Sequence, residues 1–226
     1  MNKHYVIIVA GGSGTRMKQP VPKQFLEVNG LPVLMHTIHT FAELDTQPEI
    51  IVVLPADQFS YWNELCKKHT FTIPHQVTAG GNTRFHSVKN GLSLVKEISI
   101  VGIHDAVRPC VSKQSIQRAY EAAKVKGTGV PCIPLNDSIR EVKNNCNKAL
   151  DRSHYRIIQT PQCFQSALLH SAFQQEYLET FTDDASVVEA MGHSIQLVEG
   201  NVENIKITTP SDLILAEAFL KKAKTI

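Results

Sequence analysis

The chain has 226 residues, of which 42% are hydrophobic, and this length and composition suffice for one α/β domain with a full core. Its 23 Lys and Arg residues nearly balance its 21 Asp and Glu residues, which leaves a net charge of only +2. That balance argues against nucleic-acid binding, and the N-terminal apolar run, 6–10, is too short for a signal peptide or a membrane span. We therefore expect neither a nucleic-acid partner nor a membrane partner.

The five cysteines are odd in number, scattered along the chain and never arranged as Cys-x-x-Cys. Such a set is typical of reduced thiols, so we expect a cytoplasmic protein. No internal repeat, low-complexity tract or linker divides the sequence. Residues 1–226 are therefore interpreted as a single domain.

Apolar runs alternate with segments of helical period along the first 133 residues. We expect strands at 5–9, 25–28, 49–54, 75–78, 99–104 and 129–133, and helices at 32–44, 57–68, 83–95 and 112–126. Because helices of about ten residues or more separate most of the strands, the crossovers should be right-handed and the sheet largely parallel. The predicted fold class is α/β.

This rhythm fails between Leu135 and Thr160, where two short alternating stretches flank polar turn residues. We predict a hairpin that projects from the sheet; the alternative is a long mobile loop. Because an isolated two-stranded arm is marginally stable in water, a second subunit should cover it. The chain then returns to a helical pattern at 165, to strands near 195–198 and 205–207, and to a final helix from Pro210 to about 222.

The most informative stretch follows the first strand. Gly11, Gly12 and Gly14 precede two cations, Arg16 and Lys23, on a loop stiffened by prolines. Glycines leave backbone N–H groups free to close on a phosphate, so this loop is typical of a nucleoside triphosphate site. It lacks the Gly-Lys-Ser/Thr ending of a P-loop and the third glycine of a dinucleotide fingerprint. The alternative interpretation is a glycine turn with solvated cations.

Further polar clusters follow later strands, where ligands bind in open parallel sheets. Gly80, Gly81 and Ser87 come after the strand at 75–78. Asp105 follows the strand at 99–104, where a carboxylate can hold Mg²⁺ or ribose hydroxyls; otherwise it is a capping residue. Arg108 is held extended by the proline after it and suits a fixed cation, or else forms a surface salt bridge.

Two other positions near these clusters are less specific. His104, next to Asp105, is expected to pack at a strand end rather than act as a base. The alternating stretch 204–208 predicts a lysine, Lys206, buried in a strand opposite Ile205 and Ile207. The alternative is a solvated lysine at a sheet edge.

Six motifs in this order resemble the methylerythritol phosphate cytidylyltransferases over nearly the whole chain. They are Ala10–Met17, Pro22–Phe25, His104–Pro109, Gln159–Gln162, Thr182–Ser186 and Asn204–Thr208. The resemblance implies a nucleotidyltransferase of Rossmann-like α/β build in the non-mevalonate isoprenoid pathway. It also implies a homodimer formed through a protruding β-arm, here residues 136–158.

The resemblance assigns roles to individual residues. Arg16, Lys23 and Lys206 would be catalytic, and Asp105 would hold Mg²⁺. The implied nucleotide-binding residues are Ala10, Gly11, Gly12, Gly14, Gly80, Gly81, Ser87, Asp105 and Ala106. The implied substrate-binding residues are Arg108, Ser138, Arg152 and Thr160. Ser138 stands where the family pattern has threonine, a change that keeps the hydroxyl.

The implied substrates are CTP and a polyol phosphate, 2-C-methyl-D-erythritol 4-phosphate. A phosphate monoester is already ionised at neutral pH, so its attack on CTP needs cations rather than a general base. The alternative enzyme is a ribitol 5-phosphate cytidylyltransferase, and a more distant one transfers nucleotides to a hexose phosphate or a molybdenum cofactor. The alternative from another class is a catalytically silent nucleotide sensor.

Overall fold

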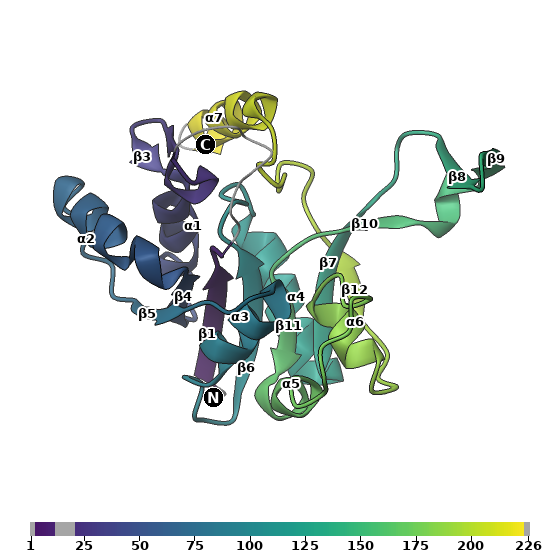
Figure 1. Ribbon diagram of the computed structural model, residues 1–226, viewed down its shortest axis with the longest axis horizontal. Coiled ribbons are helices and arrows are strands. Elements are labelled where there is room, and N and C mark those ends of the chain that lie inside the picture. The colour runs from purple at the N-terminus through teal and green to yellow at the C-terminus, as the bar shows by residue number, and fades with distance from the viewer. Residues whose placement is uncertain (1–2, 12–20, 224–226) are drawn as a thin grey trace.

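The computed structural model describes residues 3–11 and 21–223 of the chain. Within these residues the main sheet has eight strands in the order β10-β7-β11-β6-β1-β4-β5, with β12 paired to β7. They are β1 (Lys3–Val9), β4 (Glu49–Leu54), β5 (Gln76–Ala79), β6 (Ser99–Asp105), β7 (Thr128–Pro134), β10 (Arg156–Ile158), β11 (Gln162–Gln165) and β12 (Leu197–Glu199). Helices flank this sheet (Figure 1), so the predicted α/β class is confirmed.

The sheet is parallel on one side and mixed on the other. Strand β1 pairs in parallel with β4 and β6, and β4 pairs in parallel with β5. Strand β11 enters antiparallel between β6 and β7, a reversal that the sequence pattern did not predict. The carboxyl ends of the parallel strands β1, β5 and β6 therefore lie at the same edge of the sheet as the start of β11.

Helices cover both faces of the sheet, and β1 shows why. Val6 and Ile8 pack in one buried cluster with α1 (Val33–Ala42), α2 (Phe59–Lys68) and α4 (Lys113–Lys126). Tyr5 and Ile7 point to the other face, against α3 (Arg84–Leu92), α5 (Ser166–Ala172) and α6 (Asp184–Glu189). Alternate side chains of a strand point to opposite faces, so a continuously apolar strand such as β1 is one buried on both.

The helix boundaries follow local capping chemistry. Thr83 and Ser112 cap α3 and α4 with their hydroxyls, and Gly127 ends α4 with a φ of 89°, which favours glycine. Asp183 caps α6 in a reciprocal pair with Ser186. The caps of α3 and α4 lie within a few residues of the predicted boundaries, whereas no boundary of α6 was predicted.

Two predicted strands are wrong in part. Phe25 lies in a short 3₁₀ helix, η2 (Lys23–Phe25), before β2 (Glu27–Val28), which pairs with β3 (Leu31–Pro32) in a separate two-stranded sheet. Residues 205–207 form no strand, although Ile207 donates one backbone hydrogen bond to Val107. Side chains take the place of a strand partner there, since the oxygen of Asn204 accepts from Arg108.

Residues 139–150 form a hairpin that stands away from the rest of the molecule (Figure 1). Strands β8 (Ile139–Lys143) and β9 (Cys146–Leu150) are joined by Asn144 and Asn145, both at positive φ, as in a two-residue hairpin turn. A short 3₁₀ helix, η4 (Arg152–His154), leads back to the sheet.

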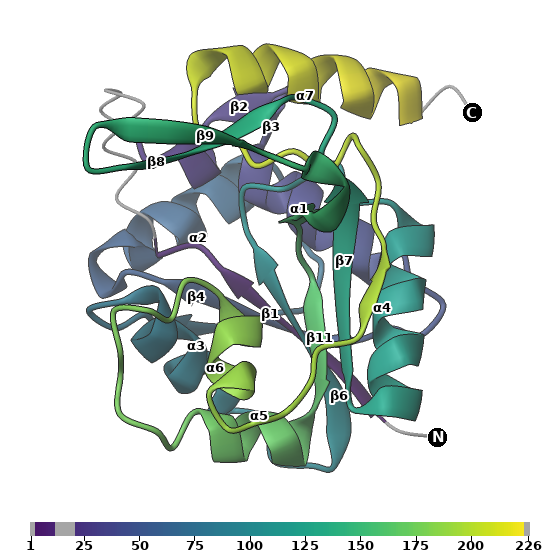
Figure 2. The same ribbon diagram turned by 90° about the vertical axis from the view of Figure 1, so that its right-hand side faces the viewer.

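The last helix, α7 (Pro210–Ala223), lies across the top of the view in Figure 2, next to β2 and β3, and contributes Ala216 to a small buried cluster with Val107 and Ile207. A further short 3₁₀ helix, η3 (Ala56–Gln58), precedes α2.

No helix within the described ranges has the length and apolar character needed to cross a bilayer. All five cysteines are free thiols.

Candidate active site

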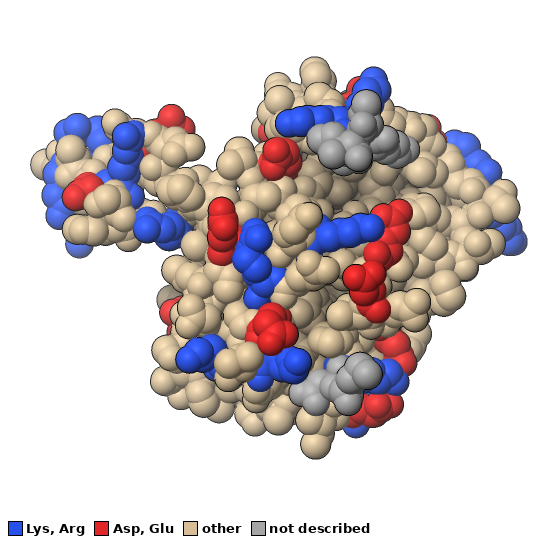
Figure 3. All heavy atoms as spheres, turned by 180° about the vertical axis from the view of Figure 1, so that it is seen from behind, with Lys and Arg blue, Asp and Glu red and all other residues tan. Residues whose placement is uncertain are grey.

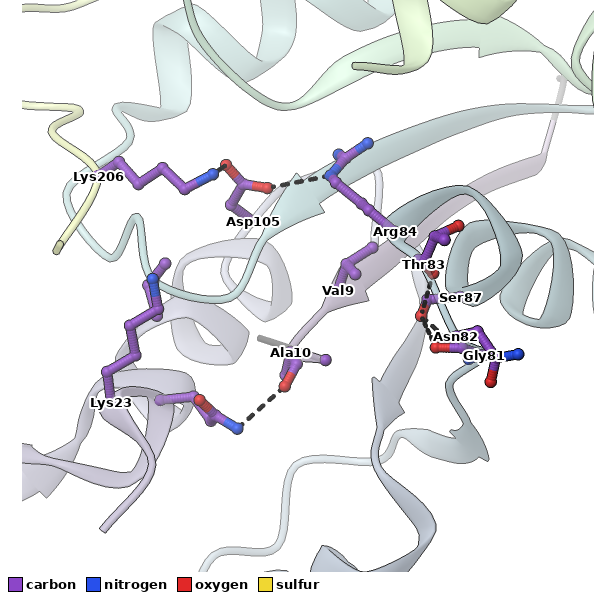
Figure 4. Close-up of a pocket in the computed structure, with 13 residues that line it drawn as sticks. Val9, Ala10, Lys23, Gly81, Asn82, Thr83, Arg84, Ser87, Asp105 and Lys206 are labelled. Atoms are coloured by element: carbon purple, nitrogen blue, oxygen red, sulfur yellow. Dashed lines mark hydrogen bonds and ion pairs between the residues drawn. The ribbon is translucent and has the colours of Figure 1, made fainter. Parts of the chain in front are cut away.

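A cavity of about 210 Å³ opens where β1, β5 and β6 end (Figure 4). It lies where ligands bind in open α/β sheets. Its described lining residues are Val9, Ala10, Gly11, Lys23, Gln24, Gly81, Asn82, Thr83, Arg84, Ser87, Asp105, Val107 and Lys206. Seven of the residues predicted from the sequence thus line one cavity: Ala10, Gly11, Lys23, Gly81, Ser87, Asp105 and Lys206.

The start of the glycine loop is fixed by backbone bonds. Ala10 donates its N–H to the oxygen of Val53 at 2.9 Å, and the side-chain amide of Gln24 donates to the oxygen of Ala10 at 3.0 Å. Gln24 thereby ties η2 to the end of β1. Gly12, Gly14 and Arg16 lie outside the described residues, so their predicted roles remain predictions.

The loop after β5 lies close against the first turn of α3. Ser87 Oγ accepts from the N–H of Gly81 at 3.1 Å and donates to the oxygen of Thr83 at 3.0 Å. A Cβ on Gly81 would lie 2.5 Å from the Cβ of His86, so only glycine permits this approach. Gly80 adjoins the same hydroxyl but does not itself line the cavity.

Asp105 is the electrostatic centre of the cavity. Its Oδ2 lies 3.0 Å from Lys206 Nζ and 3.2 Å from Arg108 Nε, while Oδ1 lies 3.5 Å from Arg84 Nε. Burial alone would raise the pKa of Asp105, but the charges of Arg84, Lys206 and Arg108 hold it well below the ordinary value. Asp105 is therefore a buried, ionised carboxylate.

Two lysines from distant parts of the chain, Lys23 and Lys206, line this cavity. Lys23, in η2, donates to the main-chain oxygen of Ile207, the residue after Lys206, at 3.4 Å. The side chain of Lys206 is 40% exposed, so the prediction of a buried lysine is wrong. An exposed ammonium that faces a cavity is well placed to receive an anion.

Thr160 and His104 form a hydrogen-bonded chain with the backbone N–H of Asp105. The N–H of Asp105 donates to Thr160 Oγ1 at 3.1 Å. The main-chain oxygen of Arg108 can only accept, so His104 Nε2 carries the ring proton and donates to it at 3.1 Å. Nδ1 of the neutral ring therefore accepts from the hydroxyl of Thr160 at 2.9 Å. Burial lowers the pKa of His104 to about 4, which keeps the ring neutral. This agrees with a packing role for His104.

The remaining predicted residues in the described part of the chain do not line the cavity themselves, although Arg108 contacts Asp105. Arg108 is mostly buried, and its Nη1 donates to the oxygen of Asn204 at 2.8 Å. Ala106 is fully buried, and its backbone groups bond to Val9 and Thr37. Ser138 and Arg152 are exposed on the projecting segment and do not line the described cavity of their own chain.

Sequence reasoning missed Arg84. Its guanidinium forms two hydrogen bonds of 2.7 Å with Asp184, at the start of α6, and also contacts Asp105. A cation in the first turn of a helix opposes the helix dipole, so its place at the start of α3 was a usable signal. The motif Thr182–Ser186 indicates the family, but nothing in it predicts the pairing of Asp184 with Arg84.

The cavity suits a hard divalent cation only when a bound nucleotide supplies further ligands. No group of three or more His, Cys, Asp and Glu residues that could hold a metal occurs in the described part of the chain. Asp105 is the acidic residue among the described lining residues. Mg²⁺ is commonly held by one or two carboxylates together with substrate phosphates and water, so Asp105 fits it as a nucleotide complex.

Comparisons with known proteins agree with this geometry. The family model of IspD, 2-C-methyl-D-erythritol 4-phosphate cytidylyltransferase, matches residues 4–222. The enzyme of that name from Phocaeicola vulgatus is 51% identical over 220 residues, covering 97% of this chain and all of that one. The Porphyromonas gingivalis enzyme is 50% identical, covering 96% and 98%.

Solved structures with the same assignment are also similar. The 4-diphosphocytidyl-2C-methyl-D-erythritol synthase from Anaerococcus prevotii has a TM-score of 0.82 at 28% identity, covering 97% of this chain and 96% of that one. The 2-C-methyl-D-erythritol 4-phosphate cytidylyltransferase from Thermus thermophilus has a TM-score of 0.75 at 30% identity, covering 98% and 100%. The resemblance seen in the sequence is thereby confirmed: the chain belongs to the 2-C-methyl-D-erythritol 4-phosphate cytidylyltransferase family.

Proposed function

We propose that this chain transfers CMP from CTP to 2-C-methyl-D-erythritol 4-phosphate and releases pyrophosphate. The observation that carries the proposal is that Lys23 and Lys206, from distant parts of the chain, line the same cavity as Asp105, Gly11 and Gly81. Family membership supplies the identity of the substrates.

The reaction joins two anions. An oxygen of the substrate phosphate attacks the α-phosphorus of CTP in line, the new P–O bond forms, and the bond to the β-phosphate oxygen breaks as pyrophosphate leaves. Because the attacking monoester is already ionised, the protein has to position the groups and neutralise charge rather than remove a proton. We assign this task to Lys23, Lys206 and Arg16.

We propose Mg²⁺ as the cofactor, with Asp105 as its protein ligand. When bound with the nucleotide, the ion would neutralise phosphate charge and favour departure of pyrophosphate. Arg84, Arg108 and Lys206 already neutralise Asp105 in the described structure, so the negative charge that attracts Mg²⁺ has to come largely from the triphosphate.

We propose that the polyol phosphate is bound by Arg108 and Thr160 together with Ser138 and Arg152. The last two lie on the projecting segment, away from the cavity of their own chain, so they would serve the cavity of a second copy. Large apolar side chains are exposed along this arm, with Val142 74% exposed, and Lys and Arg residues gather on it (Figure 3). We propose that a homodimer formed through the arm at 136–158 would cover these apolar side chains and bring the arm's cations to the partner's cavity.

The free thiols suit a reducing compartment, so we propose a cytoplasmic location.

Turnover with each polyol phosphate tests the function. Purified protein with CTP and Mg²⁺ should release pyrophosphate with 2-C-methyl-D-erythritol 4-phosphate and much more slowly with ribitol 5-phosphate. Faster release with the ribitol compound would favour the alternative enzyme. Tight CTP binding without pyrophosphate release from either acceptor would favour a nucleotide sensor.

Mixing two inactive variants tests the arm. Arg152→Ala lacks an arm cation and Lys206→Ala lacks a cavity cation, so a mixed dimer would contain one intact site. Recovery of activity on mixing is expected, up to about a quarter of the wild-type value for random pairing. Two inactive variants that stay inactive as a verified mixed dimer would argue that the arm does not reach the partner's site.

A further inference from the structure

Arg84 connects two carboxylates that come from different parts of the fold. Its two terminal nitrogens, Nη1 and Nη2, each lie 2.7 Å from one oxygen of Asp184. Its Nε lies 3.5 Å from Oδ1 of Asp105, on the side that faces the cavity. In Figure 4 the guanidinium of Arg84 and the ammonium of Lys206 approach Asp105 from opposite sides.

Asp184 is a rigid anchor for this arginine. Its side chain is buried at the start of α6, and the neighbouring Asp183 caps that helix. The amide of Gln162 further fixes the same turn, since it donates to Asp183 at 2.8 Å and accepts from the N–H of Ala185 at 2.8 Å. A buried carboxylate with a two-point bond to a guanidinium leaves that guanidinium few orientations.

The two oxygens of Asp105 are consequently in different surroundings. Oδ1 faces the anchored Arg84, whereas Oδ2 faces Lys206 and Arg108. On Oδ2, Lys206 is a mobile type of side chain with substantial exposure, whereas Arg108 is held by the main-chain oxygen of Asn204. One anchored contact leaves the carboxylate free to turn about that point, so the anchored Arg84 on Oδ1 is needed to define its plane.

We infer that Arg84, held by Asp184, is a positioning residue that sets the orientation of Asp105 toward the nucleotide. The inference rests on the proposed function, because Asp105 is the group proposed to meet the metal-bound nucleotide. It adds to that function two residues, Arg84 of α3 and Asp184 of α6, on which the orientation of Asp105 depends. Residues that orient a metal-binding group typically change affinity or activity about 10- to 100-fold when lost.

The competing explanation is that Arg84 merely neutralises a buried acid. Breaking a buried ion pair by removing one member is strongly destabilising, so a single neutral variant cannot separate the two roles. Replacing both members of the pair can separate them. In Arg84→Gln/Asp184→Asn both charges are removed together, while amide groups remain to hydrogen-bond across the same gap.

The double variant should recover stability without recovering function. We expect its unfolding temperature to exceed that of Arg84→Gln and to approach the wild-type value. Its kcat/KM for CTP should stay at least about 10-fold below wild type, because nothing charged now holds Oδ1 of Asp105. Calorimetry with a non-hydrolysable CTP analogue and Mg²⁺ should show a matching loss of affinity. Wild-type kcat/KM and affinity in a stable double variant would overturn the inference.

A conservative variant covers the case in which the double variant does not regain stability. Arg84→Lys keeps the positive charge beside Asp184 but cannot reach both carboxylates with a rigid fork. It should unfold near the wild-type temperature and still lose about 10-fold in kcat/KM and in analogue affinity. An unchanged kcat/KM would overturn the inference here too.

Arg118→Gln is the matched control. Arg118 bonds to the main-chain oxygens of Glu199 and Gly200, outside the cavity, so its loss should leave kcat/KM and analogue affinity unchanged. The wild-type assay separates this inference from the proposed function. Absent wild-type turnover would count against the function, while the analogue affinities would still decide the role of Arg84.

Discussion

The ammonium of Lys23 lies 3.4 Å from the main-chain oxygen of Ile207, although 184 positions separate the two residues in the chain. This contact joins the segment after β1 to the extended segment that carries Lys206. Two cations from different parts of the chain therefore line one cavity. The cavity is therefore prepared for charge before any ligand arrives.

Removal of Lys23 should slow turnover severely. Lys23→Ala deletes a fixed positive group, and losses of this type cost about 10²–10³ in kcat. Steady-state kinetics should show the loss in kcat, with little change in unfolding temperature because the side chain is only partly buried. Lys113→Ala is the control, since Lys113 pairs with Glu43 outside the cavity and its loss should not affect kcat. Near-wild-type activity of Lys23→Ala would remove Lys23 from the mechanism.

Neutralising Asp105 should separate nucleotide binding from turnover. Asp105→Asn leaves the cations Arg84, Arg108 and Lys206 without their shared carboxylate, so metal-free CTP should bind more tightly than to the wild type. Turnover should nevertheless fall, and added Mg²⁺ should no longer improve binding. Calorimetry with and without EDTA measures both effects. Weaker metal-free binding by a folded variant would contradict this account of the charges.

Substitutions of Thr160 test how much the hydrogen bonds of its hydroxyl contribute to stability, apart from the shape of the side chain. Thr160→Val keeps the shape but leaves the N–H of Asp105 and the ring nitrogen of His104 without a partner. A buried polar group left unsatisfied costs about 1–3 kcal/mol, so urea unfolding should show a loss of that size. Thr160→Ser, which keeps the hydroxyl, should lose far less. Equal stability of the two variants would show that the hydroxyl bonds contribute little.

The buried imidazole of His104 predicts how stability depends on pH. Its pKa is about 4 in the folded protein against 6.5 ordinarily, because burial disfavours the charged ring. Between these values the unfolded chain binds a proton that the folded chain does not, so stability falls as the pH falls through this window. The contribution is about 3 kcal/mol in total. Unfolding free energies measured from pH 7 to 4.5 should therefore drop less steeply in His104→Gln, and an identical slope would contradict the prediction.

The sequence predicted most of the elements and part of the site. Strands such as β1 and β4 are continuous apolar runs, and glycine and proline mark their ends, so pattern alone located them. Lys206 shows where pattern fails. Alternation at 204–208 resembles a strand, yet the backbone there bonds to side chains and turns Lys206 toward the cavity. Such bonds depend on residues far away in the chain, and no local pattern contains them.

Arg84 and Asp184 illustrate the same limit. They are 100 residues apart, and their pairing arises because α3 and α6 pack on one face of the sheet. The antiparallel entry of β11 is similar, since strand direction is set by the sheet and not by the four residues of β11 itself. The sequence indicated chemistry-bearing residues well, but not which of them support the others.

The direction of β11 also decides where the arm is attached. Strand β7 ends, and β11 begins, at the same rim of the sheet as the cavity, and β10 ties the returning chain to β7 through Ile157 and Ile133. Both ends of the hairpin are consequently attached at the rim of the sheet where the cavity opens, while β8 and β9 stand away from it (Figure 1). A change in the length or composition of the hairpin therefore need not move the strand ends that form the cavity.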